Sequence, residues 1–189
     1  MKAIPLVATL ILCMSWSRAE SIAETEISIV QRDSLNQISI TRNRKTIAFN
    51  SAPEGLEIEH LFLTHVRRDI SDAAIASAPP EKWVTSPASA EILSSAESHW
   101  EKWWDDRFNY YQQQVKKVPL KNNTPGTIKK QEESLKWQGL TITMIPTPGY
   151  TRDGTSWLVE FESRKVLFTG DLILAGGKVP DLYLSLIHI

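Results

Sequence analysis

Residues 147–174, TPGYTRDGTSWLVEFESRKVLFTGDLIL, hold the pattern that best predicts the fold. Two apolar runs, 155–161 and 165–170, flank the polar residues 162–164, and this spacing is typical of a β-hairpin. The loop TPGYTRDG precedes the first run, and Gly-Asp ends the second. Loops at strand ends are where a scaffold of strands and helices places its reactive groups. We therefore expect reactive side chains in these two loops, although we interpret Arg152-Asp153-Gly154 as a solvated turn.

A second informative stretch lies in the first half of the chain. EHLFLTH (59–65) predicts a short buried strand, which ends in the polar loop THVRRD. Residues 71–78 predict a helix, with Ser71 or Asp72 as its N-cap and Pro79-Pro80 as its stop. KWVTS (82–86) predicts the next strand. A succession of strand, helix and strand indicates a sheet that is covered by helices.

The rest of the chain predicts further strands and one long helix. ISIVQ (27–31) and ISITRNRKTIAFN (38–50) predict early strands, the second with a turn at Asn43-Arg44. Residues 89–114 predict the longest helix, because apolar and aromatic residues recur there at helical spacing. We interpret this stripe as a packing surface, with a substrate-facing wall as the alternative. LKWQGLTITMIPT (135–147) predicts a hairpin around Gln-Gly.

Composition narrows the class of protein. The 189 residues suffice for one domain with a hydrophobic core, and the formal net charge is −1. The sequence shows no basic face with interleaved aromatic residues, and we therefore expect no nucleic-acid partner. We expect a small-molecule substrate or ligand instead.

The first nineteen residues, MKAIPLVATLILCMSWSRA (1–19), have the layout of a secretory signal peptide. One lysine precedes an apolar stretch at 4–14, and small residues surround a cleavage point at 17–19. The apolar stretch is too short for a membrane-spanning helix. We predict export to the periplasm or the exterior, with no stable membrane span after removal of the leader. A buried N-terminal strand or helix is the alternative.

Cys13 is the only cysteine of the chain and lies within this leader. It could mark a lipid anchor, but Leu12 before it is bulkier than lipoprotein processing usually tolerates, so anchoring is not favoured. Removal of the leader would leave no thiolate and no disulfide. Any metal would then be held by His, Asp, Glu or Tyr side chains.

The last six residues, LSLIHI (184–189), correspond to the in-frame translation of a common transposon-based sequencing adapter. We interpret them as a read-through artefact and expect the natural chain to continue past Tyr183. His188 would then not be a ligand. The alternative is a natural apolar terminus.

Taken together and in order, the loops THVRRD, IPTPGYTRDG and LFTGD resemble the motifs of the metallo-β-lactamase superfamily. In that family a His-x-His-x-Asp-His loop follows a strand, a Thr-Pro-Gly-His loop comes later, and Leu-Phe-Thr-Gly-Asp ends another strand. The resemblance covers residues 27–183 and is most specific in its last third. It implies an α/β (α+β) fold, a four-layer αβ/βα sandwich that is incomplete here at the C-terminus.

The resemblance also implies a zinc centre that activates water for attack on an ester, thioester or lactam bond. His65 falls on the first histidine of the motif, Asp171 on the bridging aspartate, and Asp69 on an aspartate that can also orient the water. Three ligand positions are substituted, by Arg67, Ile70 and Tyr150. Arginine stays protonated and repels a cation, isoleucine has no donor atom, and a phenol with a pKa of about 10 is a weak ligand. The candidate ligands are therefore His65, Asp69, Asp171 and, weakly, Tyr150, for one zinc ion or none.

Two classes of function follow from this partial match. The first is a metal-dependent hydrolase. The second is a non-catalytic binding protein that keeps the fold, in which Arg67 lies between Asp69 and Asp171 as a bidentate partner and replaces the metal charge. We assign no role to His60 or His99.

Overall fold

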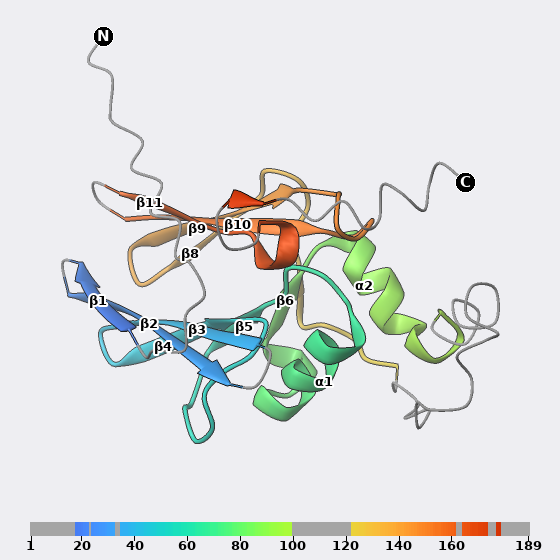
Figure 1. Cartoon of the computed structure of the whole chain (residues 1–189), viewed down its shortest axis with the longest axis horizontal. Coiled ribbons are helices and arrows are strands. Elements are labelled where there is room, and N and C mark those ends of the chain that lie inside the picture. The colour runs from blue at the N-terminus through green and yellow to red at the C-terminus, as the bar shows by residue number, and fades with distance from the viewer. Residues whose placement is uncertain are drawn as a thin grey trace, which may run out of the picture.

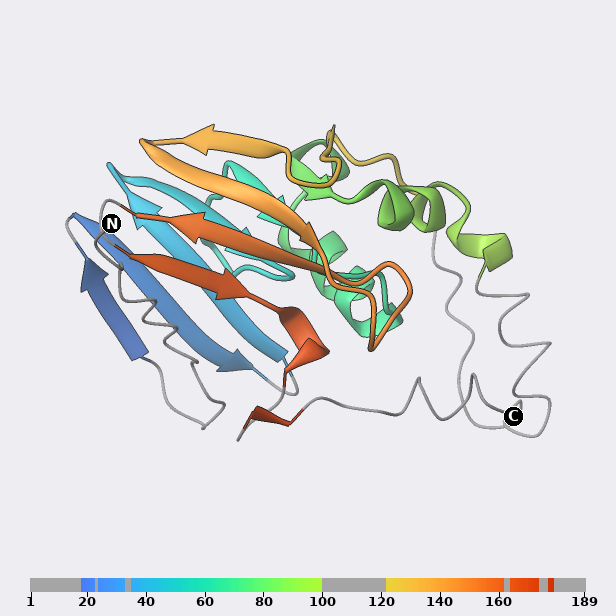
Figure 2. The same ribbon diagram turned by 90° about the horizontal axis from the view of Figure 1, so that it is seen from above.

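The computed structural model describes residues 18–22, 24–32, 35–99, 122–161, 164–173 and 177–178. They form two β-sheets that face each other, and the helices α1 (Arg68–Ser77) and α2 (Pro87–Ser94) pack against the larger sheet (Figure 1). Figure 2 shows the same sheets from above, with the loops that follow their strands gathered toward the helices.

The larger sheet has seven strands in sequence order, β1 to β7. The first four strands are antiparallel, whereas β4, β5, β6 and β7 run parallel. Helix α1 (Arg68–Ser77) connects β5 to β6, and α2 (Pro87–Ser94) follows β6. This crossover confirms the predicted succession of strand, helix and strand. The bounds are β1 (Arg18–Ile22), β2 (Thr25–Arg32), β3 (Leu35–Arg42), β4 (Lys45–Phe49), β5 (His60–Phe62), β6 (Trp83–Thr85) and β7 (Thr127–Ile128).

The smaller sheet has four antiparallel strands in the order β11-β10-β9-β8. Both predicted hairpins are confirmed, and each joins neighbouring strands of this sheet. The bounds are β8 (Ser134–Trp137), β9 (Leu140–Pro146), β10 (Thr155–Glu160) and β11 (Lys165–Phe168).

Two tight turns, one in each sheet, lie next to each other at one end of the molecule. Asn43 and Arg44 between β3 and β4 have φ of 51° and 63°, and Gln138 and Gly139 between β8 and β9 have φ of 46° and 80°. Positive φ at both central residues is the geometry that matches the twist of paired strands. The side-chain amide Nδ2 of Asn43 donates to Oε1 of Gln138 at 3.2 Å, which joins the two turns.

Glu59 adds a second link between the sheets at this end. Its carboxylate accepts from Nζ of Lys45 at 2.7 Å and from Nε1 of Trp137 at 2.7 Å. The hydrogen bond from Lys45, followed by that from Trp137, lowers the pKa of the Glu59 carboxyl below its ordinary value. The ionised form of Glu59 is therefore favoured in the folded chain.

The hydrophobic core has two layers because the central strands are buried on both faces. Ile47 and Phe62 face the smaller sheet, where they meet Trp157. Ala48 and Leu61, their direct neighbours in sequence, face the helices instead. This alternation follows from the period of two in a β-strand.

The helices differ from the prediction at their starts and, for the second, in length. Helix α1 begins at Arg68 rather than after Ser71 or Asp72, because the carbonyl oxygen of Arg67 already accepts from the amide of Ser71 at 2.8 Å. Helix α2 begins at Pro87, where the Ser86 side chain caps it by accepting from the Ser89 amide at 3.2 Å. It ends at Ser94; after a turn at Ser95, residues 96–99 are helical again, and the part of the predicted long helix after residue 99 lies outside the described residues.

Within the described part of the chain, none of the helices has the length and apolar character needed to cross a membrane. Strand β1 begins at Arg18, so the last two residues of the predicted leader pair with β2, Arg18 with Ile29 and Ala19 with Ser28. The leader, the domain bounds 27–183 and the artefact at 184–189 stay predictions.

Candidate functional site

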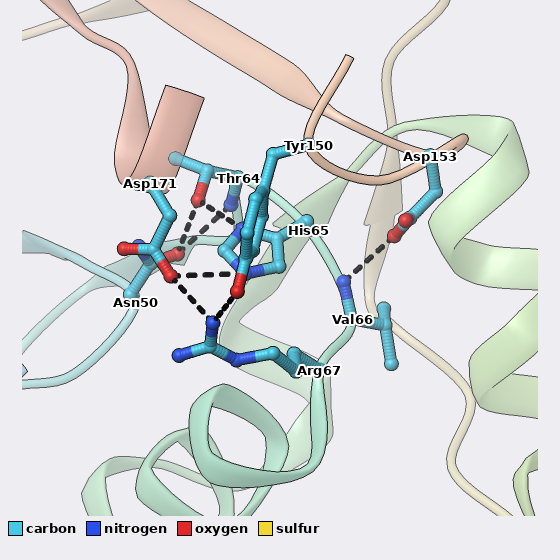
Figure 3. Close-up of polar contacts among 8 residues, drawn as sticks. All are labelled: Asn50, Thr64, His65, Val66, Arg67, Tyr150, Asp153 and Asp171. Atoms are coloured by element: carbon cyan, nitrogen blue, oxygen red, sulfur yellow. Dashed lines mark hydrogen bonds and ion pairs between the residues drawn. The ribbon is translucent and has the colours of Figure 1, made fainter. Parts of the chain in front are cut away.

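The three loops singled out in the sequence meet at one end of the two sheets. They follow β5, precede β10 and follow β11, respectively, and therefore all leave the sheets at the end opposite the tight turns (Figure 2). The loop after β5 carries Thr64 to Arg67, the loop before β10 carries Tyr150 and Asp153, and the loop after β11 carries Asp171 (Figure 3).

Four side chains from these loops form one cluster, which we call the Arg67 cluster: His65, Arg67, Tyr150 and Asp171. Nη1 of Arg67 lies 3.1 Å from Oδ2 of Asp171 and donates a hydrogen bond to the Tyr150 hydroxyl. The guanidinium carbon also lies 5.3 Å from the centroid of the Tyr150 ring. His65 lies behind this pair, with Nε2 3.7 Å from Oδ2 of Asp171 and its ring edge-on to Tyr150 (Figure 3).

The described residues of the Arg67 cluster do not fit a zinc ion. Zinc takes donor atoms about 2.0–2.3 Å away and three or four protein ligands. His65 and Asp171 supply two donors, but the Tyr150 oxygen accepts from a guanidinium, which also carries the positive charge beside Asp171. Among the described residues, no group of three or more His, Cys, Asp or Glu is placed to hold a metal ion.

Two motif positions lie on α1, beyond the cluster. Asp69 is the second residue of the helix, and its side chain lies outside the described residues, so its pairing with Arg67 stays a prediction. Ile70 is buried, with 2% of its surface exposed. The fourth position of the first motif is thus occupied by an apolar side chain that is removed from solvent.

Asp153 has a structural role that the sequence did not reveal. The interpretation of Arg152-Asp153-Gly154 as a solvated turn is wrong for Asp153, which is 5% exposed. Its Oδ2 accepts from the amide of Val66 at 2.7 Å and from Oγ of Ser89 at 2.8 Å. A buried carboxylate is stabilised by such donors, and here the two donors come from the first loop and from α2.

Backbone contacts add to this attachment. The amide of Thr155 donates to the carbonyl oxygen of Thr64 at 2.7 Å, and Nε1 of Trp157 donates to that of Leu63 at 2.9 Å. With Asp153, residues 63, 64 and 66 of the first loop are each bonded to residues 153–157. The position of His65 and Arg67 is therefore set by the start of β10.

A small pocket lies beside the Arg67 cluster. Its cavity volume is about 10 Å³, which is room for about one water molecule. Five of its lining residues are threonines, and His65 and Tyr150 form part of its wall. The lining consists of Thr64, His65, Thr147, Tyr150, Thr151, Gly154, Thr155, Thr169 and Leu172. Such a pocket accommodates one water molecule or one small polar group of a ligand that lies at its mouth.

The other two described histidines, His60 and His99, lie outside the Arg67 cluster. Burial lowers the pKa of both below the ordinary value of 6.5. Both imidazoles are therefore neutral at pH 7.

Comparisons with known proteins address the fold. No protein-family model and no curated protein sequence matches the chain. Among similar solved structures, a metallo-beta-lactamase of Cronobacter sakazakii has a TM-score of 0.53 and 16% identity, and the match covers 78% of this chain and 59% of that one. The metallo-beta-lactamase FEZ-1 of Legionella gormanii has a TM-score of 0.52 and 16% identity, with 82% of this chain and 63% of that one covered. BJP-1, a subclass B3 metallo-beta-lactamase of Bradyrhizobium japonicum, has a TM-score of 0.51 and 17% identity, with 76% of this chain and 58% of that one covered.

These likenesses confirm the expected fold class, the αβ/βα sandwich, of which the described residues form both sheets and the helices that cover the larger one. At 16–17% identity they show the fold alone. The chain spans about three fifths of the length of the structures it matches.

Proposed function

Because the chain has the metallo-β-lactamase fold, we propose that it is the binding part of a protein that has exchanged the metal centre for the Arg67 cluster. The protein then binds a small anionic molecule and does not hydrolyse it. The observation that carries this proposal is the Arg67 guanidinium, which lies 3.1 Å from Asp171 and is hydrogen-bonded to Tyr150. It supplies one fixed positive charge where the family motif implies metal ligands.

The exposed guanidinium of Arg67 supports an anionic ligand, although one of its nitrogens is paired with Asp171. About 35% of the Arg67 side-chain surface is exposed, so the side chain is accessible to a small solute. A guanidinium has five N–H donors in a planar fork that matches a carboxylate or phosphate. The hydroxyl of Thr151, which lines the pocket and has no hydrogen-bond partner among the described residues, is a donor of the kind that orients such a group.

Metal analysis of the purified protein tests this proposal. We expect less than stoichiometric zinc in the unmodified protein, because a protonated guanidinium repels the cation. The double variant Arg67→His plus Tyr150→His restores two imidazole donors and is expected to gain zinc. Stoichiometric zinc in the unmodified protein would overturn the proposal.

Anion binding is tested separately, by the shift of the thermal midpoint with acetate and with inorganic phosphate. We expect stabilisation by at least one of these anions and its loss in Arg67→Gln, which keeps a polar side chain without the charge. Lys45→Gln, a change of charge at the opposite end of the sheets, is the matched control. Equal responses of the two variants would show that the anion acts at no specific site.

A metal-dependent hydrolase is the second candidate, and one observation favours it. The Cronobacter sakazakii enzyme carries the motif HARLDQ, in which His, Arg and Asp occupy the first, third and fifth places. HVRRDI, residues 65–70 of this chain, has the same three residues in the same places. An arginine at the third place is therefore found in a protein described as a metallo-beta-lactamase.

Hydrolysis assays distinguish the two candidates. A metal-dependent hydrolase cleaves a lactam or thioester substrate at a rate that a chelator abolishes and added zinc restores. The binding protein shows no turnover in any of these conditions. The matched variant Asp171→Asn removes turnover in the first case and changes only anion binding in the second.

We also propose export of the protein, on the strength of residues 1–19. Mass spectrometry of the mature N-terminus tests this, with cleavage near Ala19 as the expected result. An intact Met1 in the purified natural protein would contradict it.

A further inference from the structure

Thr64 is hydrogen-bonded on both sides, to Asn50 and to His65. Its amide donates to Oδ1 of Asn50 at 2.9 Å, and its hydroxyl donates to the same oxygen at 3.0 Å. The hydroxyl oxygen also lies 3.0 Å from Nδ1 of His65 (Figure 3). Thr64 and His65 are 1% and 3% exposed, so these contacts are shielded from water.

The chemistry of the three groups determines where each proton lies. A backbone amide only donates, so the atom of Asn50 that it meets is the carbonyl oxygen. That oxygen only accepts, so the Thr64 hydroxyl uses its single proton toward Asn50. The contact between Thr64 and His65 is then a hydrogen bond only if Nδ1 of His65 carries a proton and donates it.

The backbone holds these groups in place. Asn50 has a φ of 60°, a conformation in which Asn is several-fold enriched, and its amide donates to Phe62 at 2.9 Å. Gly170 has a φ of 56°, and a Cβ added there would come within 2.3 Å of the Thr64 hydroxyl oxygen. The absence of a Cβ at Gly170 is therefore what allows the Thr64 side chain to occupy this place.

We propose that Asn50 and Thr64 are positioning residues that fix His65 as the Nδ1–H tautomer, with the lone pair of Nε2 directed toward Asp171 and Arg67. Asp171 favours the opposite tautomer, but it is 3.7 Å from Nε2, beyond hydrogen-bond distance, and is paired with Arg67. The bond to Thr64 at 3.0 Å is within that distance and prevails.

This tautomer sets the class of ligand, an inference that rests on the proposed function. Arg67 attracts an anionic group, while Nε2 of His65 accepts a hydrogen bond and donates none. The best small ligand therefore carries a carboxylate together with a neighbouring hydroxyl or amine that donates to His65. A carboxylate without such a donor binds by its charge alone.

Nitrogen NMR of histidine-labelled protein, recorded where the imidazoles are neutral, tests the tautomer directly. We expect the proton of His65 on Nδ1 in the unmodified protein. Thr64→Val, which keeps the shape and removes the hydroxyl, is expected to move it to Nε2, and Asn50→Gly, which tolerates the positive φ, to weaken the preference. Asn50→Asp keeps an acceptor and is expected to keep the tautomer.

Thr41→Val is the matched control, because Thr41 also makes a hydroxyl hydrogen bond, to Thr46 at 3.0 Å in the larger sheet. It is expected to leave the His65 signals unchanged. A proton on Nε2 of His65 in the unmodified protein, or an unchanged tautomer in Thr64→Val, would overturn the positioning role.

Binding of glycolate and acetate tests the ligand class. We expect glycolate to bind about fivefold tighter than acetate, the effect of one added hydrogen bond, and Thr64→Val to remove most of this difference. Equal affinities in the unmodified protein refute the ligand class. If neither anion binds while the tautomer is as expected, the proposed function fails and the positioning role stands.

Discussion

At one end of the sandwich the strands are joined by tight turns, whereas at the other end they lead into the loops of the candidate site (Figure 2). The first end, called the turn end, is formed by residues that are neighbours in sequence: Asn43-Arg44 and Gln138-Gly139 adopt the positive φ that closes each hairpin. The other end, called the site end, is held together by residues far apart in sequence, such as Val66 and Asp153, which are 87 positions from each other. Local chemistry builds the first end, and long-range hydrogen bonds build the second.

This difference matters for function because a fold can keep its turn end while its site end changes. The hydrophobic cluster between the sheets includes neither Arg67 nor Tyr150. The loops of the site are instead held by Asp153, Thr155 and Trp157, which contact mainly their backbone. Side chains within such loops can therefore be exchanged without loss of the fold.

The largest expected effect is that of Trp157→Ala. Trp157 is fully buried between the sheets and donates to Leu63 at 2.9 Å, so its removal is expected to cost about 3–5 kcal/mol of unfolding free energy. Trp137→Ala, which removes a buried indole at the turn end, is the variant for comparison. Urea unfolding measures both, and only Trp157→Ala is expected to shift the His65 resonances. Equal shifts in the two variants would show that the ends are not independent.

Gly170 and Gly139 offer a sharper comparison. Both have positive φ, so alanine at either position costs roughly 1–2 kcal/mol of backbone strain. An added Cβ meets nothing within 4 Å at Gly139 but comes within 2.3 Å of Thr64 at Gly170. Thermal unfolding should therefore show Gly170→Ala to be less stable than Gly139→Ala, by about 1–3 kcal/mol. Equal losses would mean that Thr64 moves aside freely.

Asp153→Ala tests the attachment of the first loop. It leaves the Val66 amide and the Ser89 hydroxyl without their acceptor, at an expected cost of about 2–3 kcal/mol. Asp153→Asn is expected to cost less, because both donors meet the same oxygen and an amide oxygen still accepts. The rate of hydrogen exchange at the Val66 amide measures the loss of this attachment. Retained protection in Asp153→Ala would contradict the attachment.

The smallest effect is expected at the turn end, from Glu59→Gln. The ion pair with Lys45 is exposed, and such pairs contribute up to about 1 kcal/mol. Since the folded pKa of Glu59 lies below its unfolded value, its contribution is present above pH 4.5 and is lost as the pH falls through the folded pKa. Unfolding measured from pH 7 to pH 3 should show a smaller acid loss in Glu59→Gln. An identical pH profile would exclude a role for this carboxyl.

The elements of the fold were largely predictable from the sequence, because each has a local signal. Asn43-Arg44 and Gln138-Gly139 mark their turns, and alternation in 140–146 marks a strand with one buried face. The start of α1 was not predictable, since Arg67 provides no side-chain cap and the helix begins where a backbone carbonyl accepts the first bond. The expected side-chain cap at Ser71 or Asp72 therefore predicted the wrong start for this helix.

The site was predictable in outline and not in its connections. Motif order indicated that His65, Tyr150 and Asp171 belong together, and the structure places them together with Arg67. Nothing local distinguishes Asp153 from a solvated turn residue, because its partners Val66 and Ser89 are distant in sequence. The relation of Asn50 to His65 likewise depends on a contact that only the fold creates.

The contact between Arg67 and Tyr150 makes the two substituted positions evolutionarily dependent on each other. Tyr150 accepts from the guanidinium and lies under its charge, so a histidine at position 150 alone would meet a fixed cation. A histidine at position 67 alone would leave Tyr150 without that donor. Each single reversal is therefore expected to be worse than the pair, and the route back to a histidine-rich centre passes through an unfavourable intermediate. Such epistasis would preserve the present cluster in descendants of this chain, even where selection favours metal binding.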